Sequence, residues 1–182
     1  MLLKGFRVTE FRSVSDSEWI DAEQVTALIG TNESGKTNIL LPLWKLNPAE
    51  DGAIDLQDDL PRDKYHIYRD AKNKPVFIRA KYALSQAEAT ELSNVAECPI
   101  DWVSEIIVGR DFDGNYILEF PFEGDLGEDA QPLNQREGVW EYVKNNMPKY
   151  VYYSNYGNLD AQIYLPQVLQ NIDRTGLGTK EQ

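Results

Sequence analysis

The alternation of apolar and polar residues near the start of the chain predicts three short strands. We expect them at residues 3–9, 18–20 and 25–30, with a turn at residues 13–17 between the first two. The third strand contains Val25, Thr26 and Ile29, β-branched residues of the kind that strands favour. It leads into a glycine-bearing loop, and the apolar run 38–46 after the loop predicts a helix. Pro42 predicts a kink over residues 38–41 or an early end of that helix.

The middle of the chain has the pattern of an antiparallel β-rich region, which we place at residues 74–120. Before it, residues 47–60 predict a surface loop and residues 62–69 one or two helical turns. A strand is expected at 74–84, and Ser85 with Glu88 forms a capping-box pattern that predicts a helix through about Val95. The pair Asp113-Gly114, between apolar runs at 102–110 and 116–120, predicts a hairpin.

The last part of the chain predicts a helix, a strand and a second helical stretch over residues 134–172. A loop is expected at 123–131, a helix at 134–146, a strand at 149–153 and an interrupted helix at 159–172, before a polar end at 175–182. Four tyrosines near the strand could stack on nucleic-acid bases, but a half-buried strand explains them better; they are Tyr150, Tyr152, Tyr153 and Tyr156.

Composition favours one ordered domain and argues against several kinds of site. The chain has 182 residues, 42% of them apolar, and no apolar run of the length that spans a membrane; with no signal-peptide pattern, we expect a cytoplasmic protein without membrane contact. Cys98 is the single cysteine, and His66 the single histidine, so a disulfide or a cysteine-cluster metal site is excluded. The net charge of −12 predicts weak DNA binding by this chain alone, although a basic face could be hidden in the total.

The most informative motif fits the phosphate-binding pattern GxxxxGK[ST] at every specified position. Its backbone N–H groups would surround a β-phosphate, and its two glycines allow the chain to wrap closely. Lys36 would contact the phosphates, and the Thr37 hydroxyl would be a Mg²⁺ ligand. The motif therefore predicts binding of ATP with Mg²⁺ by a loop that opens a helix; its residues are Gly30, Thr31, Asn32, Glu33, Ser34, Gly35, Lys36 and Thr37.

The segment from Phe6 to Leu40 resembles the N-terminal end of ABC-type ATPases of the SMC, RecF and OLD group. The resemblance rests on Phe11-Arg12-Ser13 after a strand, and on the loop with Asn32 and Asn38 about twenty residues later. Glu10 stands where the group usually has Asn. The resemblance favours this group over GTPases and small-molecule kinases.

This resemblance implies a mixed α/β fold of the P-loop NTPase type, in which the chain is the N-terminal lobe of an ABC-ATPase head. Residues 1–182 would form one partial domain, with the strands, loop and loop helix at 1–46, the antiparallel lobe at 74–120 and the helix-strand-helix at 134–172. Residues 30–38 would bind the phosphates and Thr37 the Mg²⁺. Arg12 and Ser13 would lie beside the nucleotide, although Arg12 could equally be a surface arginine.

Two elements of such ATPases are missing from the sequence after Thr37. No four-residue apolar run followed by Asp-Glu is present, and no Leu-Ser-Gly-Gly-like segment. The resemblance implies that both come from a C-terminal half of the head or from a second head, so we expect an N-terminal piece of a longer ATPase that hydrolyses ATP very slowly alone. Gln57 and residues 154–160 are both candidates for the family's glutamine loop.

Three functions are consistent with these features. The first is the ATP-binding lobe of an OLD- or SMC-like ATPase that acts in DNA repair or antiviral defence, with DNA as a partner of the full-length protein. The second is a stand-alone module in which nucleotide binding controls a protein contact. The third, a small kinase, ranks last because the arginines that a lid would need are scattered along the chain.

Overall fold

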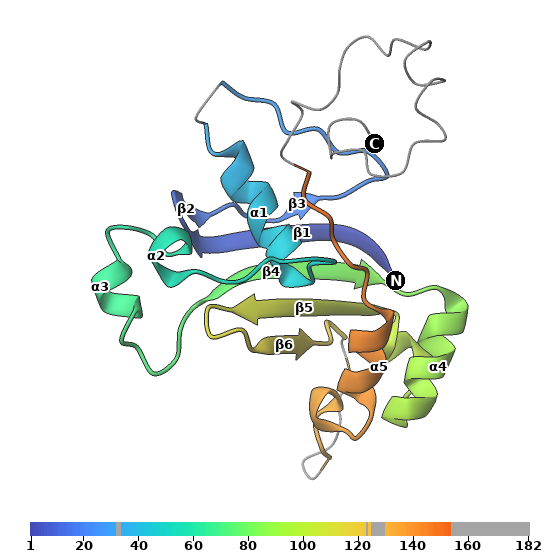
Figure 1. Cartoon of the computed structure of the whole chain (residues 1–182). Helices are drawn as coiled ribbons and strands as arrows, with labels where there is room; N and C mark the ends of the chain where they lie inside the picture. Colours follow the sequence, from blue (N-terminus) through green and yellow to red (C-terminus); the bar gives the residue numbers. More distant parts are fainter. Residues whose placement is uncertain (32–33, 123, 125–129, 154–182) are drawn as a thin grey trace, which may run out of the picture. The chain divides into compact units, whose positions relative to one another are not determined.

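The computed structural model describes residues 1–31, 34–122, 124 and 130–153 (Figure 1). The chain forms two compact units, Met1–Val151 and Tyr152–Gln182. Most of the second unit lies outside the described residues, including the expected helix at 159–172, the polar end and Tyr156. The first unit has an α+β fold, a mostly antiparallel sheet with helices, and the assignment of residues 1–182 to one ATPase head remains a prediction.

The sheet is built around one long strand, β1, which spans Leu2–Phe11. On one side β1 pairs with β2 (Val14–Asp16) and β3 (Ile20–Asp21), and on the other with β4 (Val76–Ala83). The sheet continues through β5 (Glu105–Asp111) to β6 (Tyr116–Glu119) in the order β2-β1-β4-β5-β6, and each pair is antiparallel. The strand expected at 74–84 and the hairpin around Asp113-Gly114 are confirmed, and Gly114 has the positive φ of 86° that its turn requires.

Five α-helices and two 3-10 helices accompany the sheet in the described residues (Figure 1). They are α1 (Lys36–Leu46), α2 (Leu56–Asp59), α3 (Tyr65–Tyr68), α4 (Gln86–Ala96), η1 (Ile100–Val103), η2 (Leu133–Gln135) and α5 (Val139–Asn146). The predicted capping box at the start of α4 is confirmed. Among the described residues, none of these helices has the length and apolar character needed to cross a membrane.

The core combines apolar residues of the sheet with a cluster of three phenylalanines. The rings of Phe77 and Phe112 have centroids 5.0 Å apart, and Phe11 lies 5.7 Å from Phe77. All three side chains are buried, and such aromatic contacts add to the stabilisation from burial. The cluster holds the end of β1 in place, so it positions the turn that follows Phe11.

The strand expected at residues 25–30 is wrong. Residues 22–31 form no strand, and the side chains of Val25 and Ile29 are 88% and 96% exposed. The β-branched composition favoured a strand, but a strand also needs a neighbour that accepts and donates its backbone hydrogen bonds. No described strand pairs with this segment, so the strand preference of its β-branched residues was not enough to form a strand.

Several other boundaries also differ from expectation. The strand expected at 18–20 is β3 at Ile20–Asp21, and the turn expected at 13–17 is mostly β2. The helix expected at 134–146 is η2 followed by α5, and the strand expected at 149–153 is reduced to one bridge between Pro48 and Tyr150. The side chain of Tyr150 hydrogen-bonds Tyr82 with 2.7 Å between the hydroxyl oxygens, and burial raises the pKa of Tyr150 to about 12.

Pro42 predicted a kink over residues 38–41 or an early end of the loop helix, and the early end is wrong, because α1 continues past Pro42 to Leu46. Proline removes one backbone donor from a helix interior. Here the residues from Leu41 to Leu46 include four that are buried, and α1 packs against β1 and β4. Burial of this half of the helix offsets the lost hydrogen bond, so the helix survives.

Candidate functional site

The glycine loop opens α1 as the motif predicts. Gly35 is the N-cap residue with φ 89°, a left-handed conformation that favours glycine, and α1 begins at Lys36. Gly30 needs its missing side chain for another reason: a Cβ there would lie 2.6 Å from the Ser34 hydroxyl oxygen. Both glycines therefore permit the backbone path, whereas Asn32 and Glu33 lie outside the described residues.

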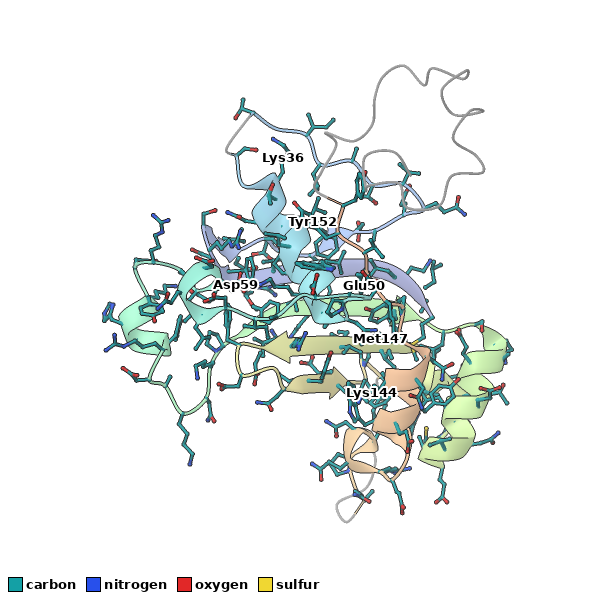
Figure 2. The ribbon with its side chains drawn as sticks, viewed as in Figure 1. Lys36, Glu50, Asp59, Lys144, Met147 and Tyr152 are labelled. Carbon is teal, nitrogen blue, oxygen red and sulfur yellow. The ribbon has the colours of Figure 1, made fainter. Side chains whose placement is uncertain are left out.

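Lys36 folds back over its own loop (Figure 2). Its ammonium donates to the carbonyl oxygens of Gly30 and Thr31, at 2.7 and 2.6 Å, and lies 3.3 Å from the Ser34 hydroxyl. These acceptors are uncharged, and the contacts are exposed to solvent. A phosphate oxygen, which carries negative charge, would be a stronger acceptor for the same ammonium.

Thr37 is the expected Mg²⁺ ligand, and its surroundings fit that role. Its side chain is exposed, and no described residue makes a hydrogen bond to its hydroxyl. The described residues contain no group of three or more His, Cys, Asp or Glu that could hold a metal. A Mg²⁺ ion at Thr37 would therefore take its other ligands from phosphate and water, which Mg²⁺ commonly does.

The structure brings Arg12 and Ser13 to the start of α1. They form the two-residue turn between β1 and β2, where Phe11 pairs with Val14 and Arg12 has a φ of 52°. The side-chain amide of Asn38 on α1 donates to the Ser13 hydroxyl at 2.8 Å. Residues 12, 13 and 38, which the resemblance grouped together, thus meet in space through a hairpin turn and the first turns of a helix.

Sequence analysis missed Asp59, a fully buried carboxylate that joins α1 to this turn. The ammonium of Lys45 on α1 forms a buried ion pair with it, and the guanidinium of Arg12 lies 3.2 Å from its other oxygen. The backbone N–H of Asp55 also donates to it, at 2.9 Å. In the sequence nothing distinguishes Asp59 from the exposed Asp58 beside it.

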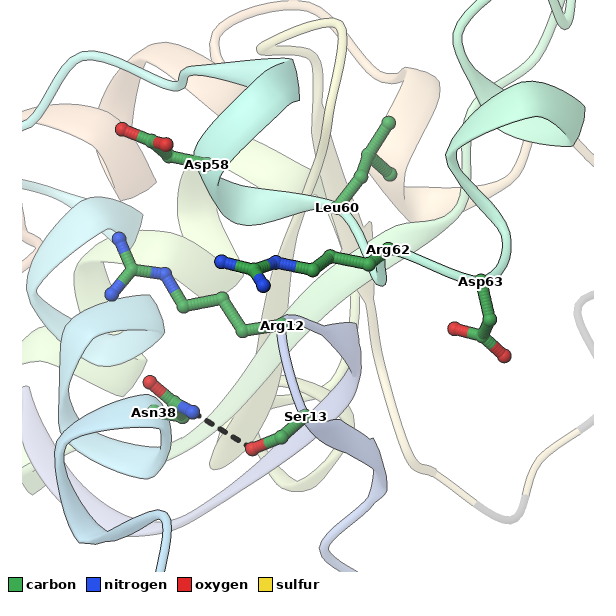
Figure 3. Close-up of a pocket in the computed structure, with 7 residues that line it drawn as sticks. All are labelled: Arg12, Ser13, Asn38, Asp58, Leu60, Arg62 and Asp63. Carbon is green, nitrogen blue, oxygen red and sulfur yellow. Dashed lines mark hydrogen bonds between the residues drawn. The ribbon is translucent and has the colours of Figure 1, made fainter. Parts of the chain in front are cut away.

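A pocket of about 740 Å³ opens next to this turn (Figure 3). Arg12, Ser13 and Asn38 form one part of its lining, and α2 and the segment after it form the rest through Asp58, Leu60, Arg62 and Asp63. Arg62 was one of the scattered arginines that the sequence analysis assigned to no site, because no motif surrounds it. Gln57, a candidate for the glutamine loop, lies on α2 outside this lining, and the other candidate, residues 154–160, lies outside the described residues.

The two residues that composition had set aside from metal binding lie elsewhere in the fold. His66 is exposed on the short helix α3. Cys98 follows α4 and is half-buried, and this burial raises the pKa of its thiol. Neither residue lines the pocket.

Comparisons with known proteins add no relative to this picture. The scan against protein-family models and the search of curated proteins both give no match for this chain. The candidate site therefore rests on the motif and on the geometry described above.

Proposed function

We propose that this protein binds ATP with Mg²⁺ through residues 30–38, as the N-terminal lobe of an OLD- or SMC-like ATPase head. One observation carries the proposal: the complete GxxxxGK[ST] motif runs through a left-handed Gly35 into the N-terminus of α1. A helix start with unsatisfied N–H groups favours an anion. The meeting of Ser13 with Asn38 beside the same helix supports the proposal.

The chain's own residues would each do a separate part of the binding. Lys36 would exchange its neutral loop carbonyls for negatively charged phosphate oxygens, so that both donor and acceptor of its hydrogen bonds would be ionised. Thr37 would hold the Mg²⁺ ion, which neutralises phosphate charge. Arg12, anchored by Asp59, would add a second cation next to the loop.

The proposed lobe binds nucleotide but completes hydrolysis only with further residues. The sequence lacks the apolar run followed by Asp-Glu that would orient water. A C-terminal half of the head or a second head would supply it. The chain's net charge of −12 opposes DNA binding by the chain itself. Contacts with DNA would therefore be made by other parts of the complete protein.

Titration with ATP and Mg²⁺ tests the site. We expect Lys36→Ala to weaken binding by at least about tenfold, because it removes a charge-assisted contact worth about 1.5–3 kcal/mol. Lys144→Ala on α5 removes the same charge at an exposed position away from the loop and should bind like wild type (Figure 2). Equal affinities of wild type and Lys36→Ala would refute the assignment.

A second function, a nucleotide-dependent protein contact, is favoured by the exposure of Val25 and Ile29 immediately before the loop. Exposed apolar residues in a group can mark a protein interface. In that case Ile29→Ser would abolish an ATP-dependent complex with another protein while leaving ATP affinity unchanged. Loss of ATP binding in the same variant would argue against a separate contact surface.

A further inference from the structure

The pocket beside α1 contains two arginines whose electrostatic environments differ. Arg12 has a buried counter-charge, because its guanidinium lies 3.2 Å from the Asp59 carboxylate. Arg62 forms no ion pair or hydrogen bond with any described residue. Figure 3 shows both guanidinium groups directed into the same hollow, with Arg62 extending toward Arg12.

Two cations that face one pocket repel each other unless an anion lies between them. Asp59 cannot serve both, since it already receives Lys45, Arg12 and the N–H of Asp55. The other two acids of the lining, Asp58 and Asp63, are exposed and form no ion pair with Arg62 among the described residues. The pocket therefore holds a guanidinium that is free to bind an anionic ligand.

The position of the pocket suggests which anion this is. Asn38 lines it and belongs to the first turns of α1, two residues after Lys36. Ser13 also lines it and would lie 3.7 Å from a Cβ placed on Gly35, the residue that starts the helix. The pocket thus lies beside the first turns of α1, directly after the loop that would hold the phosphates.

We propose that Arg62 is a second phosphate-binding arginine of this site, which contacts the phosphate chain of the nucleotide in the pocket that it shares with Arg12. The proposal rests on the proposed ATP site. A guanidinium suits the role because its planar set of donors can bind two phosphate oxygens at once. Arg62 comes from the segment after α2, so its contact would also tie that segment to the occupied loop.

Binding of two ligands, ATP with Mg²⁺ and inorganic tripolyphosphate with Mg²⁺, tests this role. Arg62→Gln should weaken both by about 10- to 100-fold, the range expected for one charge-assisted contact. Arg62→Lys should fall between this variant and wild type, because it keeps the charge but loses the paired donors. Arg69→Gln is the matched control: it removes an exposed arginine that pairs with Asp70 on the surface, and it should bind both ligands like wild type.

The two ligands separate a phosphate contact from a base contact. If Arg62→Gln weakens ATP but not tripolyphosphate, Arg62 stacks on the base or contacts the ribose, and the proposal is overturned. Unchanged affinity for both ligands overturns it as well. Without ligand, the Tm of Arg62→Gln should be equal to that of wild type or slightly higher, because the side chain holds no described contact and its charge faces that of Arg12; a large loss of Tm would instead indicate a structural role.

Comparing Lys36→Ala with Arg62→Gln tests the ATP site and the Arg62 contact separately. Weak binding by Lys36→Ala with normal binding by Arg62→Gln would support the loop and reject the Arg62 contact. The reverse pattern would reject the loop as the ATP site and retain the pocket as a phosphate site. Loss in both variants supports both assignments.

Discussion

Among the described residues, α1 and α4 are the two longest helices, with eleven residues each, and their N-termini are capped in different ways. At α4 the Ser85 side chain accepts from the N–H of Glu88, and the Glu88 carboxylate accepts from the N–H of Ser85 and from the amino group of Met1. At α1 the cap is Gly35, with no side-chain hydrogen bond and no acidic residue in the first turn. The N-terminus of α4 thus has side-chain acceptors for its backbone N–H groups, whereas the N-terminus of α1 has none from its cap residue.

The buried residues of the two helices are distributed just as differently. α4 buries Ala89, Leu92 and Ala96 along its length, whereas the buried residues of α1 all lie between Leu41 and Leu46. The C-terminal half of α1 is thus part of the core, and its first turn lies outside. A helix anchored at one end can present its other end to a ligand without loss of packing, which is what a phosphate loop requires.

The largest effect should come from the buried charge that anchors α1. Asp59→Asn leaves the ammonium of Lys45 without its buried counter-charge, so we expect the free energy of unfolding to fall by about 3–5 kcal/mol in denaturant titrations. Asp58→Asn, one residue earlier and exposed, should change it by less than about 0.5 kcal/mol. Similar effects of the two variants would show that the network does not anchor the helix.

A smaller loss of stability is expected from truncating a leucine in each helix, and it should differ between α4, which is buried along its length, and α1, which is buried only in its C-terminal half. Leu92→Ala in α4 removes a fully buried side chain and should cost about 2–5 kcal/mol. Leu40→Ala in α1 removes the same atoms from a side chain that is 41% exposed, and it should cost less than about 1 kcal/mol. Chemical denaturation of both variants gives the comparison directly, and an equal cost would contradict the burial of the two helices.

These helices also show how far the sequence predicts the fold. Ser85 and Glu88 determine the start of α4 because a capping box involves only neighbours along the chain, and the glycine loop predicts the start of α1 for the same reason. The Asp113-Gly114 hairpin is equally local. Such features can be predicted because the residues that form them are close in sequence.

Contacts between distant segments could not be predicted in this way. The apolar run at residues 25–29 predicted a strand, but its pairing depends on a neighbour that the described chain does not provide. Asp59 lies in the segment 47–60, whose composition indicated only a surface loop, and Arg62 begins the segment 62–69, which indicated only one or two helical turns. Their roles depend on α1 and on the turn at Arg12, which the fold brings to the same place.

The smallest expected effect is the contribution of Glu88, at the capped N-terminus of α4, to the pH dependence of stability. The hydrogen bond from the Met1 amino group, followed by that from the Ser85 N–H, lowers the pKa of Glu88 from its ordinary value of 4.5. A carboxyl group whose pKa is lower in the folded state contributes stability that is complete above about pH 4.5 and is lost as the pH falls through the folded-state value. Glu88→Gln should therefore lose less stability than wild type as the pH falls below 4.5, measured by thermal unfolding, and Gln86→Ala should follow wild type. An unchanged acid profile in Glu88→Gln would show that Glu88 ionises as freely in the folded chain as in the unfolded one, and that the start of α4 is held by its neutral hydrogen bonds alone.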